Sequence, residues 1–314
     1  MIRFHTWKTV LHAAIALAGA MLLSACASAS RSEDAPDRDP RAVSVYRDGA
    51  TPATWQEMVD ACAAADAVLV GENHGHPMGL AAASALWEDI LAKSSGSGTL
   101  ALEFFERDEQ VALDDYMNGV TDEEAFRKAA RRTNSNYPPG HRSMVEAAKS
   151  AQRPVIAANA PRRYVRIARL DGYEKLQGLS PEQKRLFRIP DSLPTGHYRD
   201  AFNKIMTSEA DHKDGEPEQT DFSHLDSSFR SQSLWDWTMA ESVARALEAR
   251  SGPVLLVIGR FHVDHEGGTV LALRQLSPGS EIKTVSFVNT DAPSDDDKNR
   301  ADFVVFVGPG PETD

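Results

Sequence analysis

The stretch AVLVGENH at residues 67–74 decides the fold, and the stretch LLVIGRFH at residues 255–262 matches it. Each is a short apolar run that leads directly into Gly-x-x-His. Unbroken apolar runs of this length are typical of strands buried on both faces of a parallel sheet. The glycine allows the chain to turn sharply off its strand. Since open α/β sheets bind ligands beyond the carboxyl ends of their strands, we expect His74 and His262 on adjacent or facing loops of one site.

Similar apolar runs predict further strands at residues 99–104, 154–158, 284–288 and 303–307. Helical patterns alternate with them at residues 54–65, 78–93, 233–250 and 268–275. This alternation predicts an α/β fold with a mostly parallel β-sheet flanked by helices. We expect one domain over residues 43–308, with helical parts at about 108–150 and a helical insertion at about 173–232, followed by a short tail at 309–314.

The N-terminus has the features of a bacterial lipoprotein signal. A basic start precedes an uncharged apolar run at residues 10–23, which is too short for a transmembrane helix. The sequence LSAC at residues 23–26 matches the lipobox, so we predict a signal peptide at 1–25 and lipidation of Cys26. An ordinary signal peptide with an incidental cysteine is the alternative. Ala27, where Asp would indicate inner-membrane retention, favours the outer membrane, and residues 27–42 predict a disordered tether.

The composition limits the kinds of partner. The formal net charge is −12, and removal of the basic signal peptide makes the mature chain more acidic still. This charge disfavours nucleic acids and anionic lipid surfaces as partners. Once Cys26 is lipidated, only Cys62 remains, so we expect no internal disulfide.

Four residues at strand ends form a candidate polar site: Glu72, His74, Glu103 and His262. Glu103 lies within an apolar run, and a buried carboxylate needs a partner, which Arg107 or His74 could supply. Imidazoles beside carboxylates suit acid–base chemistry, and His74, Glu103 and His262 are also candidate ligands of a divalent metal.

The order and spacing of these motifs resemble the paired Gly-x-x-His signature of the Tiki/TraB/erythromycin-esterase/ChaN group. Two further stretches, VIAANAPR at 155–162 and QSLWDWTMA at 232–240, are similar to segments of its ChaN family. The resemblance covers roughly residues 43–308. It implies a lipoprotein that binds haem, as a homodimer, and that takes part in iron uptake.

The resemblance also implies a set of ligand-binding residues. Where the family often has a Trp followed by Tyr-Arg-Pro, this chain reads YPPGHRS at 137–143, which places Tyr137 at the Trp position and His141 at the Tyr position. Because Tyr or His can hold a haem iron, either is a candidate axial ligand. Guanidinium groups can also pair with the carboxylates of a ligand. The full set of candidate ligand-binding residues is Arg107, Tyr137, His141, Arg142, Asn159 and Arg162.

Three functions compete at this stage. The first is capture of haem or an iron complex at the outer membrane. The second is a metal- or His-dependent hydrolase that uses Glu72, His74, Glu103 and His262. The third is a non-catalytic interaction module of the cell envelope. The chain has no Gly-x-Ser-x-Gly elbow and no phosphate-binding loop of the Gly-x-x-x-x-Gly-Lys type, which argues against serine-hydrolase and P-loop chemistry.

Overall fold

The computed structural model describes residues 38–211, 223–249 and 252–310. The predicted signal peptide, Cys26, most of the predicted tether and most of a polar stretch at 211–221 lie outside these ranges. Within the described ranges, no helix is long and apolar enough to cross a membrane.

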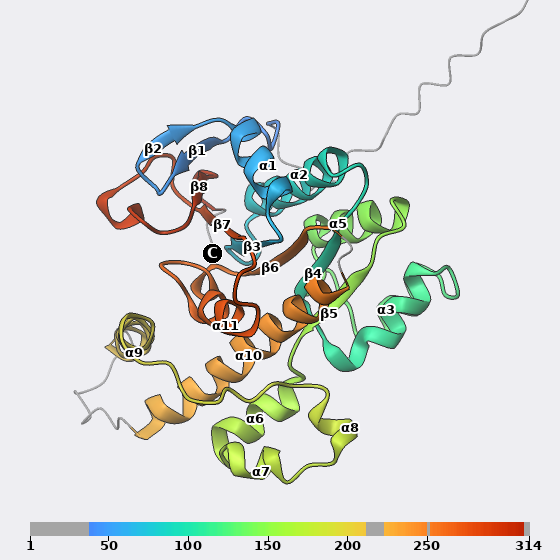
Figure 1. Ribbon diagram of the computed structural model, residues 1–314, viewed down its shortest axis with the longest axis vertical. Helices are drawn as coiled ribbons and strands as arrows, with labels where there is room; N and C mark the ends of the chain where they lie inside the picture. Colours follow the sequence, from blue (N-terminus) through green and yellow to red (C-terminus); the bar gives the residue numbers. More distant parts are fainter. Residues whose placement is uncertain (1–37, 212–222, 250–251, 311–314) are drawn as a thin grey trace, which may run out of the picture. The chain divides into compact units, whose positions relative to one another are not determined.

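The described residues are built on an eight-stranded sheet in the order β2-β1-β8-β7-β3-β6-β4-β5 (Figure 1). The strands from β8 to β5 are parallel, whereas β1 pairs antiparallel with both β2 and β8, so the predicted mostly parallel sheet is confirmed. The strands are β1 (Ser44–Arg47), β2 (Thr51–Ala53), β3 (Ala67–Glu72), β4 (Thr99–Glu106), β5 (Val155–Asn159), β6 (Val254–Gly259), β7 (Ile282–Val288) and β8 (Phe303–Phe306).

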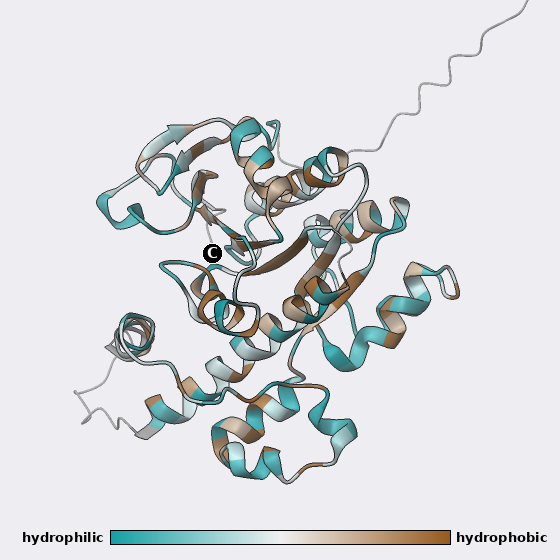
Figure 2. Ribbon diagram, in the orientation of Figure 1, coloured by the Kyte–Doolittle hydropathy of each residue, from teal (hydrophilic) through white to brown (hydrophobic). Residues whose placement is uncertain are grey.

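Helices cover both faces of the sheet (Figure 1). Because successive side chains of a strand point to opposite faces, Val68 and Val70 pack under one helical layer and Ala67 and Leu69 under the other. The first layer comprises α1 (Trp55–Ala64), α2 (Pro77–Lys93) and α5 (Pro139–Ser150), and the second comprises α10 (Ser223–Glu248) and α11 (Gly268–Leu276). The strands between these layers are strongly hydrophobic in Figure 2, as burial on both faces requires.

The two Gly-x-x-His motifs lie at the topological switch point of the sheet, where the connections after neighbouring strands leave to opposite faces. Strand β3 pairs directly with β6, with Gly71 opposite Ile258 and Glu72 opposite Gly259. Helix α2, which follows β3, covers one face of the sheet, whereas α11, which follows β6, covers the other. Connections that leave to opposite faces open a crevice beyond the carboxyl ends of the two strands, which is where such sheets bind ligands.

The smaller helices lie around this framework. Helices α3 (Gln110–Met117) and α4 (Glu123–Ala129) connect β4 to α5. The region from β5 to α10, expected to be helical, contains α6 (Arg162–Leu170), α7 (Tyr173–Gln177), α8 (Pro181–Lys184) and α9 (His197–Asp211). Short 3₁₀ helices follow β4, at η1 (Arg107–Glu109), follow β6, at η2 (Arg260–His262), and precede β8, at η3 (Asp295–Asp297).

The structure differs from the sequence-based expectations in a few places. The hairpin of β1 and β2 was not predicted, because its strands are only 4 and 3 residues long and lack an apolar run. Thr54 caps α1 through a capping box with Glu57, and Asp122 caps α4. Residues 38–42 were predicted to belong to the tether. They instead contact the domain, because the guanidinium of Arg41 donates two hydrogen bonds to Asp89 of α2.

Candidate functional site

A buried carboxylate joins two imidazoles at the end of β3. The carboxylate of Glu72, the last residue of this strand, is fully buried, and its Oε1 lies 3.0 Å from Nδ1 of His74. Its Oε2 lies 2.8 Å from Nε2 of His141, which is fully buried in α5. The ring of Phe104 packs against both imidazoles. Glu72 therefore fixes the orientation of His74, whose own side chain is 56 % exposed.

A second carboxylate–imidazole pair lies at the end of β6. His262 in η2 places its Nδ1 2.6 Å from Oδ1 of Asp236, a buried residue of α10. The hydroxyls of Tyr198 and Thr269 both donate to Asp236, at 2.6 and 2.8 Å. Three donors on one buried carboxylate leave it well satisfied, as a buried charge requires.

Glu103 lies between the two pairs. Its Oε2 accepts the backbone N–H of Gly259 at 2.6 Å, and its Oε1 is 3.8 Å from Nε2 of His262. The pairing of β4 with β5 shifts register between Leu102 and Glu106, which is a bulge that redirects side chains at the strand end. A Cβ atom on Gly259 would approach Nε2 of His74 to 2.8 Å, so only glycine allows the two motifs to meet this closely.

The charges of the site stabilise one another. Burial alone would raise the pKa of the Glu72 carboxyl, but the charge and hydrogen bond of His141, assisted by His74, bring it below its usual range. The hydrogen bond to Glu72 raises the pKa of His74 despite its partial burial. Burial also opposes protonation of His262, yet the charge and hydrogen bond of Asp236, with Glu103 nearby, raise its pKa. The arrangement can hold, donate or accept protons at two imidazoles on either side of Glu103.

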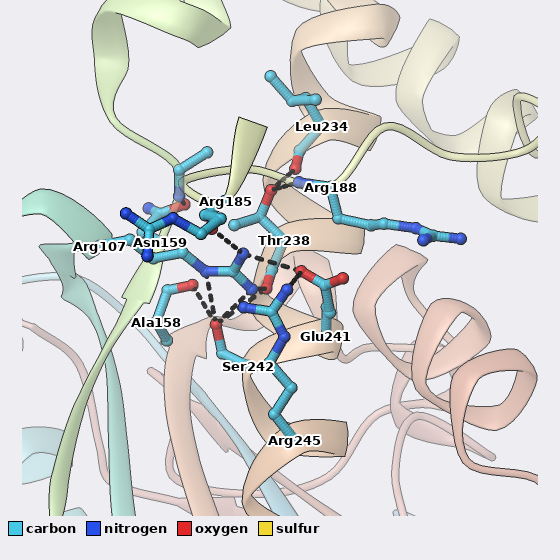
Figure 3. A network of polar contacts seen from close by, with 11 residues as sticks. Arg107, Ala158, Asn159, Arg185, Arg188, Leu234, Thr238, Glu241, Ser242 and Arg245 are labelled. Atoms are coloured by element: carbon cyan, nitrogen blue, oxygen red, sulfur yellow. Dashed lines mark hydrogen bonds and ion pairs between the residues drawn. The ribbon is translucent and has the colours of Figure 1, made fainter. Parts of the chain in front are cut away.

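Arg107 lies away from this cluster and does not pair with Glu103. Its buried guanidinium donates to Glu241 at 2.8 Å, to the carbonyl of Thr238 at 2.7 Å and to the Ser242 hydroxyl (Figure 3). Three residues further on, the side-chain amide of Gln110 bonds the backbone of Val155 and Ala157 on the edge strand β5. Two conspicuous positions of the Glu103-x-x-x-Arg107-x-x-Gln110 stretch thus hold α10 and the sheet edge in place.

The other predicted ligand-binding residues are dispersed. Tyr137 is buried between Phe105 and Phe126, and burial raises the pKa of its hydroxyl. Arg142 pairs with Glu123 on the surface. The side chain of Asn159 bonds the N–H of Ala160, and Arg162, 90 % exposed, lies 3.7 Å from Glu106. Of the predicted ligand-binding set, the structure brings only His141 to the polar cluster.

The predicted metal ligands are not grouped as a metal centre. His262 and Glu103 are neighbours, but within residues 38–211, 223–249 and 252–310 no group of three or more His, Cys, Asp and Glu side chains could hold a metal ion.

Sequence reasoning missed Tyr198 and left Asp236 unplaced. Tyr198 comes from a helix without a recognisable motif, whereas Asp236 lies in the family-like stretch QSLWDWTMA. Only the fold places both beside His262. His141 was noted as a candidate haem ligand, yet nothing in the sequence indicated that Glu72 would be its partner.

A mostly parallel α/β sheet with imidazole–carboxylate pairs at the ends of two adjacent strands defines a ligand-binding α/β domain of the paired Gly-x-x-His class. The family model described as "Haem-binding uptake, Tiki superfamily, ChaN" matches residues 58–273, a span that includes both motifs. The chain belongs to this family.

A solved structure shares the fold. The chain is similar to the structure titled "Cofacial heme binding to ChaN of Campylobacter jejuni", with a TM-score of 0.63 and 16 % identity over 84 % of this chain and 96 % of that one. The type III effector HopBA1 matches with a TM-score of 0.45 and 12 % identity over 81 % of this chain and 92 % of that one. No curated protein sequence matches the chain.

The buried Arg107 network predicts a large loss of stability on substitution. Arg107→Gln leaves the acceptors of α10 without their charged donor, so we expect a loss of about 3–5 kcal/mol in the free energy of unfolding. Urea denaturation followed by circular dichroism measures it. The matched control is Arg163→Gln, which breaks a half-exposed pair with Asp108 and should cost at most about 1 kcal/mol. Equal effects of the two substitutions would contradict this assignment.

The His262–Asp236 pair predicts a pH-dependent stability. Because the folded state raises the pKa of His262, its stabilising contribution is complete below the unfolded pKa of about 6.5 and is lost as pH rises through the folded pKa. The stability difference between the wild type and His262→Gln should therefore shrink from pH 6 to pH 9. The control is His265→Gln, because burial and the charge of Arg300 lower the pKa of His265, whereas the pKa of His262 is raised. A difference for His262→Gln that grows with pH would refute the pairing.

Proposed function

We propose that this chain binds haem at the carboxyl edge of its sheet, as a lipid-anchored protein of the outer membrane that serves iron uptake. The observation that carries the proposal is that the family model spans both Gly-x-x-His motifs, which the fold brings together on adjacent strands. The anchor is the lipidated Cys26 predicted from the sequence, and a homodimer is the assembly that the family resemblance implies.

The residues first considered as axial ligands do not fit an iron atom in this structure. Tyr137 is only 2 % exposed and is surrounded by aromatic rings. His141 is fully buried with its Nε2 on Glu72. His74, a candidate metal ligand, has its Nδ1 on Glu72, and its side chain is 56 % exposed. Tyr137 and His141 therefore support the core and the polar cluster, and the haem ligand lies elsewhere on this edge.

Haem titration of the full chain in detergent, followed by the Soret band, tests the proposal. We expect saturable binding in the wild type and an unchanged spectrum in Tyr137→Phe, because the hydroxyl of Tyr137 lies inside the core. The proposal would be wrong if wild-type spectra changed only linearly with added haem. A spectrum altered by Tyr137→Phe would instead show that the tyrosine reaches the iron.

A second candidate function is hydrolysis, and one observation favours it. Two imidazoles, each oriented by a buried carboxylate, lie on either side of Glu103, and oriented imidazoles of this kind act as general acids and bases. Haem binding as such would not require this arrangement.

The hydrolase candidate predicts activity that depends on His262 and its carboxylate. With 4-nitrophenyl acetate as the probe, Asp236→Asn and His262→Ala should each reduce kcat/KM by about 100-fold or more. His265→Ala, on the same turn but outside the cluster, serves as the control. Hydrolysis that is equal in all four proteins would exclude the cluster as its source.

A further inference from the structure

An open groove of about 480 Å³ lies beside the edge strand β5, between this strand, α10 and the segment that follows α8. Its volume falls within the range of sites that bind small molecules. None of the residues of the polar cluster lines this groove, so it is separate from the site at the two Gly-x-x-His motifs.

The floor of the groove is apolar. It is formed by Ile156 and Ala157 of β5, by Ala246 of α10 and by Leu186. Ile156 and Leu186 are only partly buried, although they pack against the core on either side. The floor therefore leaves apolar surface that a ligand could cover.

The backbone of β5 is already occupied along this groove. The side-chain amide of Gln110 donates to the carbonyl of Val155 at 2.9 Å, and its oxygen accepts the N–H of Ala157 at 2.7 Å. A strand added by a peptide needs free backbone groups on the edge that it joins. Because Gln110 uses these groups, the groove suits a small molecule rather than a peptide strand.

Three guanidinium groups give the groove a positive charge: those of Arg107, Arg185 and Arg245. Among the described residues, no acidic side chain lines it. Glu241 lies behind it and pairs with Arg107 at 2.8 Å and with Arg245 at 3.1 Å (Figure 3). Three positive charges against one negative charge leave an excess of two, in a chain whose formal net charge is −12. Such a local reversal of charge attracts an anion.

Arg185 and Arg245 are the two cations that a ligand can reach. The side chain of Arg245 is 54 % exposed, and Arg185 is exposed and forms no ion pair within the described residues. Arg107 is only 8 % exposed and holds α10 rather than a ligand. Its pKa is lowered to about 10, first by burial and further by the charge of Arg245, although Glu241 opposes this. The positive charge here is therefore incompletely balanced.

We propose that this groove binds a small carboxylate with a short aliphatic body. The carboxylate pairs with Arg185 and Arg245, since a guanidinium group binds a carboxylate through two parallel hydrogen bonds. The aliphatic body lies on Ile156 and Leu186, where it removes apolar surface from water. This site goes beyond the proposed function, because it does not depend on haem.

Titration with hexanoate of the full chain in phosphatidylcholine nanodiscs, followed by amide proton–nitrogen NMR, tests the proposal. Empty nanodiscs give the blank. We expect saturable shifts of the amides of Ala157, Leu186 and Ala246, while those of Gly71 and Gly259 stay unchanged. Acetate lacks the aliphatic body and hexan-1-ol lacks the charge, so each should bind at least about tenfold more weakly than hexanoate.

Variants of the two exposed arginines test the charged side of the groove. Arg245→Gln should weaken hexanoate binding by about fivefold, as for one partly exposed ion pair, and Arg185→Gln combined with it by about 25-fold. The matched control is Arg274→Gln on α11. Like Arg245, Arg274 is about half-exposed and pairs with one glutamate, but it lies outside the groove, so this variant should bind hexanoate as the wild type does.

The outcomes that would overturn the proposal are distinct from those that bear on haem. Shifts that increase only linearly in the wild type, or equal binding by the wild type and the double variant, would overturn it. Acetate that binds as tightly as hexanoate would overturn the assignment to a ligand with an aliphatic body. Haem binding should be unchanged in the double variant, because the groove is separate from the Gly-x-x-His motifs.

Discussion

The parallel pairing of β3 with β6 is the constraint on which the rest of the structure depends. It places Glu72 opposite Gly259 and so brings two motifs almost two hundred residues apart in the chain to one edge of the sheet. The contact is close because a glycine stands at or next to the end of each strand: a Cβ atom on Gly71 would approach the Cα of Arg260 to 2.8 Å. Since α2 and α11 leave to opposite faces, this edge stays open to a ligand.

Buried carboxylates then convert this edge into a defined site. Glu72 and Asp236 each orient one imidazole of a Gly-x-x-His motif, and each is itself held by a further buried side chain, His141 or Tyr198. Arg107 performs a purely structural task nearby, because it ties the end of β4 to α10, the helix that carries Asp236. The cluster and its supports are therefore one cooperative unit.

Much of the fold could be predicted from local patterns. The strands at β3, β4, β5, β6, β7 and β8 are apolar runs buried on at least one face, and the helices between them have clear amphipathic or capping signals. The β1–β2 hairpin was missed because its strands are short and lie at the sheet margin. Within the site, Glu72, His74, Glu103 and His262 were identified because they lie in or just after the ends of apolar runs. Tyr198 was missed, and Asp236, although part of a family-like stretch, could not be paired with His262, since a helix residue reveals its partner only after the helix has been placed.

A crystal structure of the full chain with haem, with the iron located by anomalous scattering, tests the central claim most directly. The account predicts an iron peak beyond the carboxyl ends of β3 and β6, where the two Gly-x-x-His motifs meet. A peak beside Tyr137, inside the core, or the absence of any iron peak would contradict it.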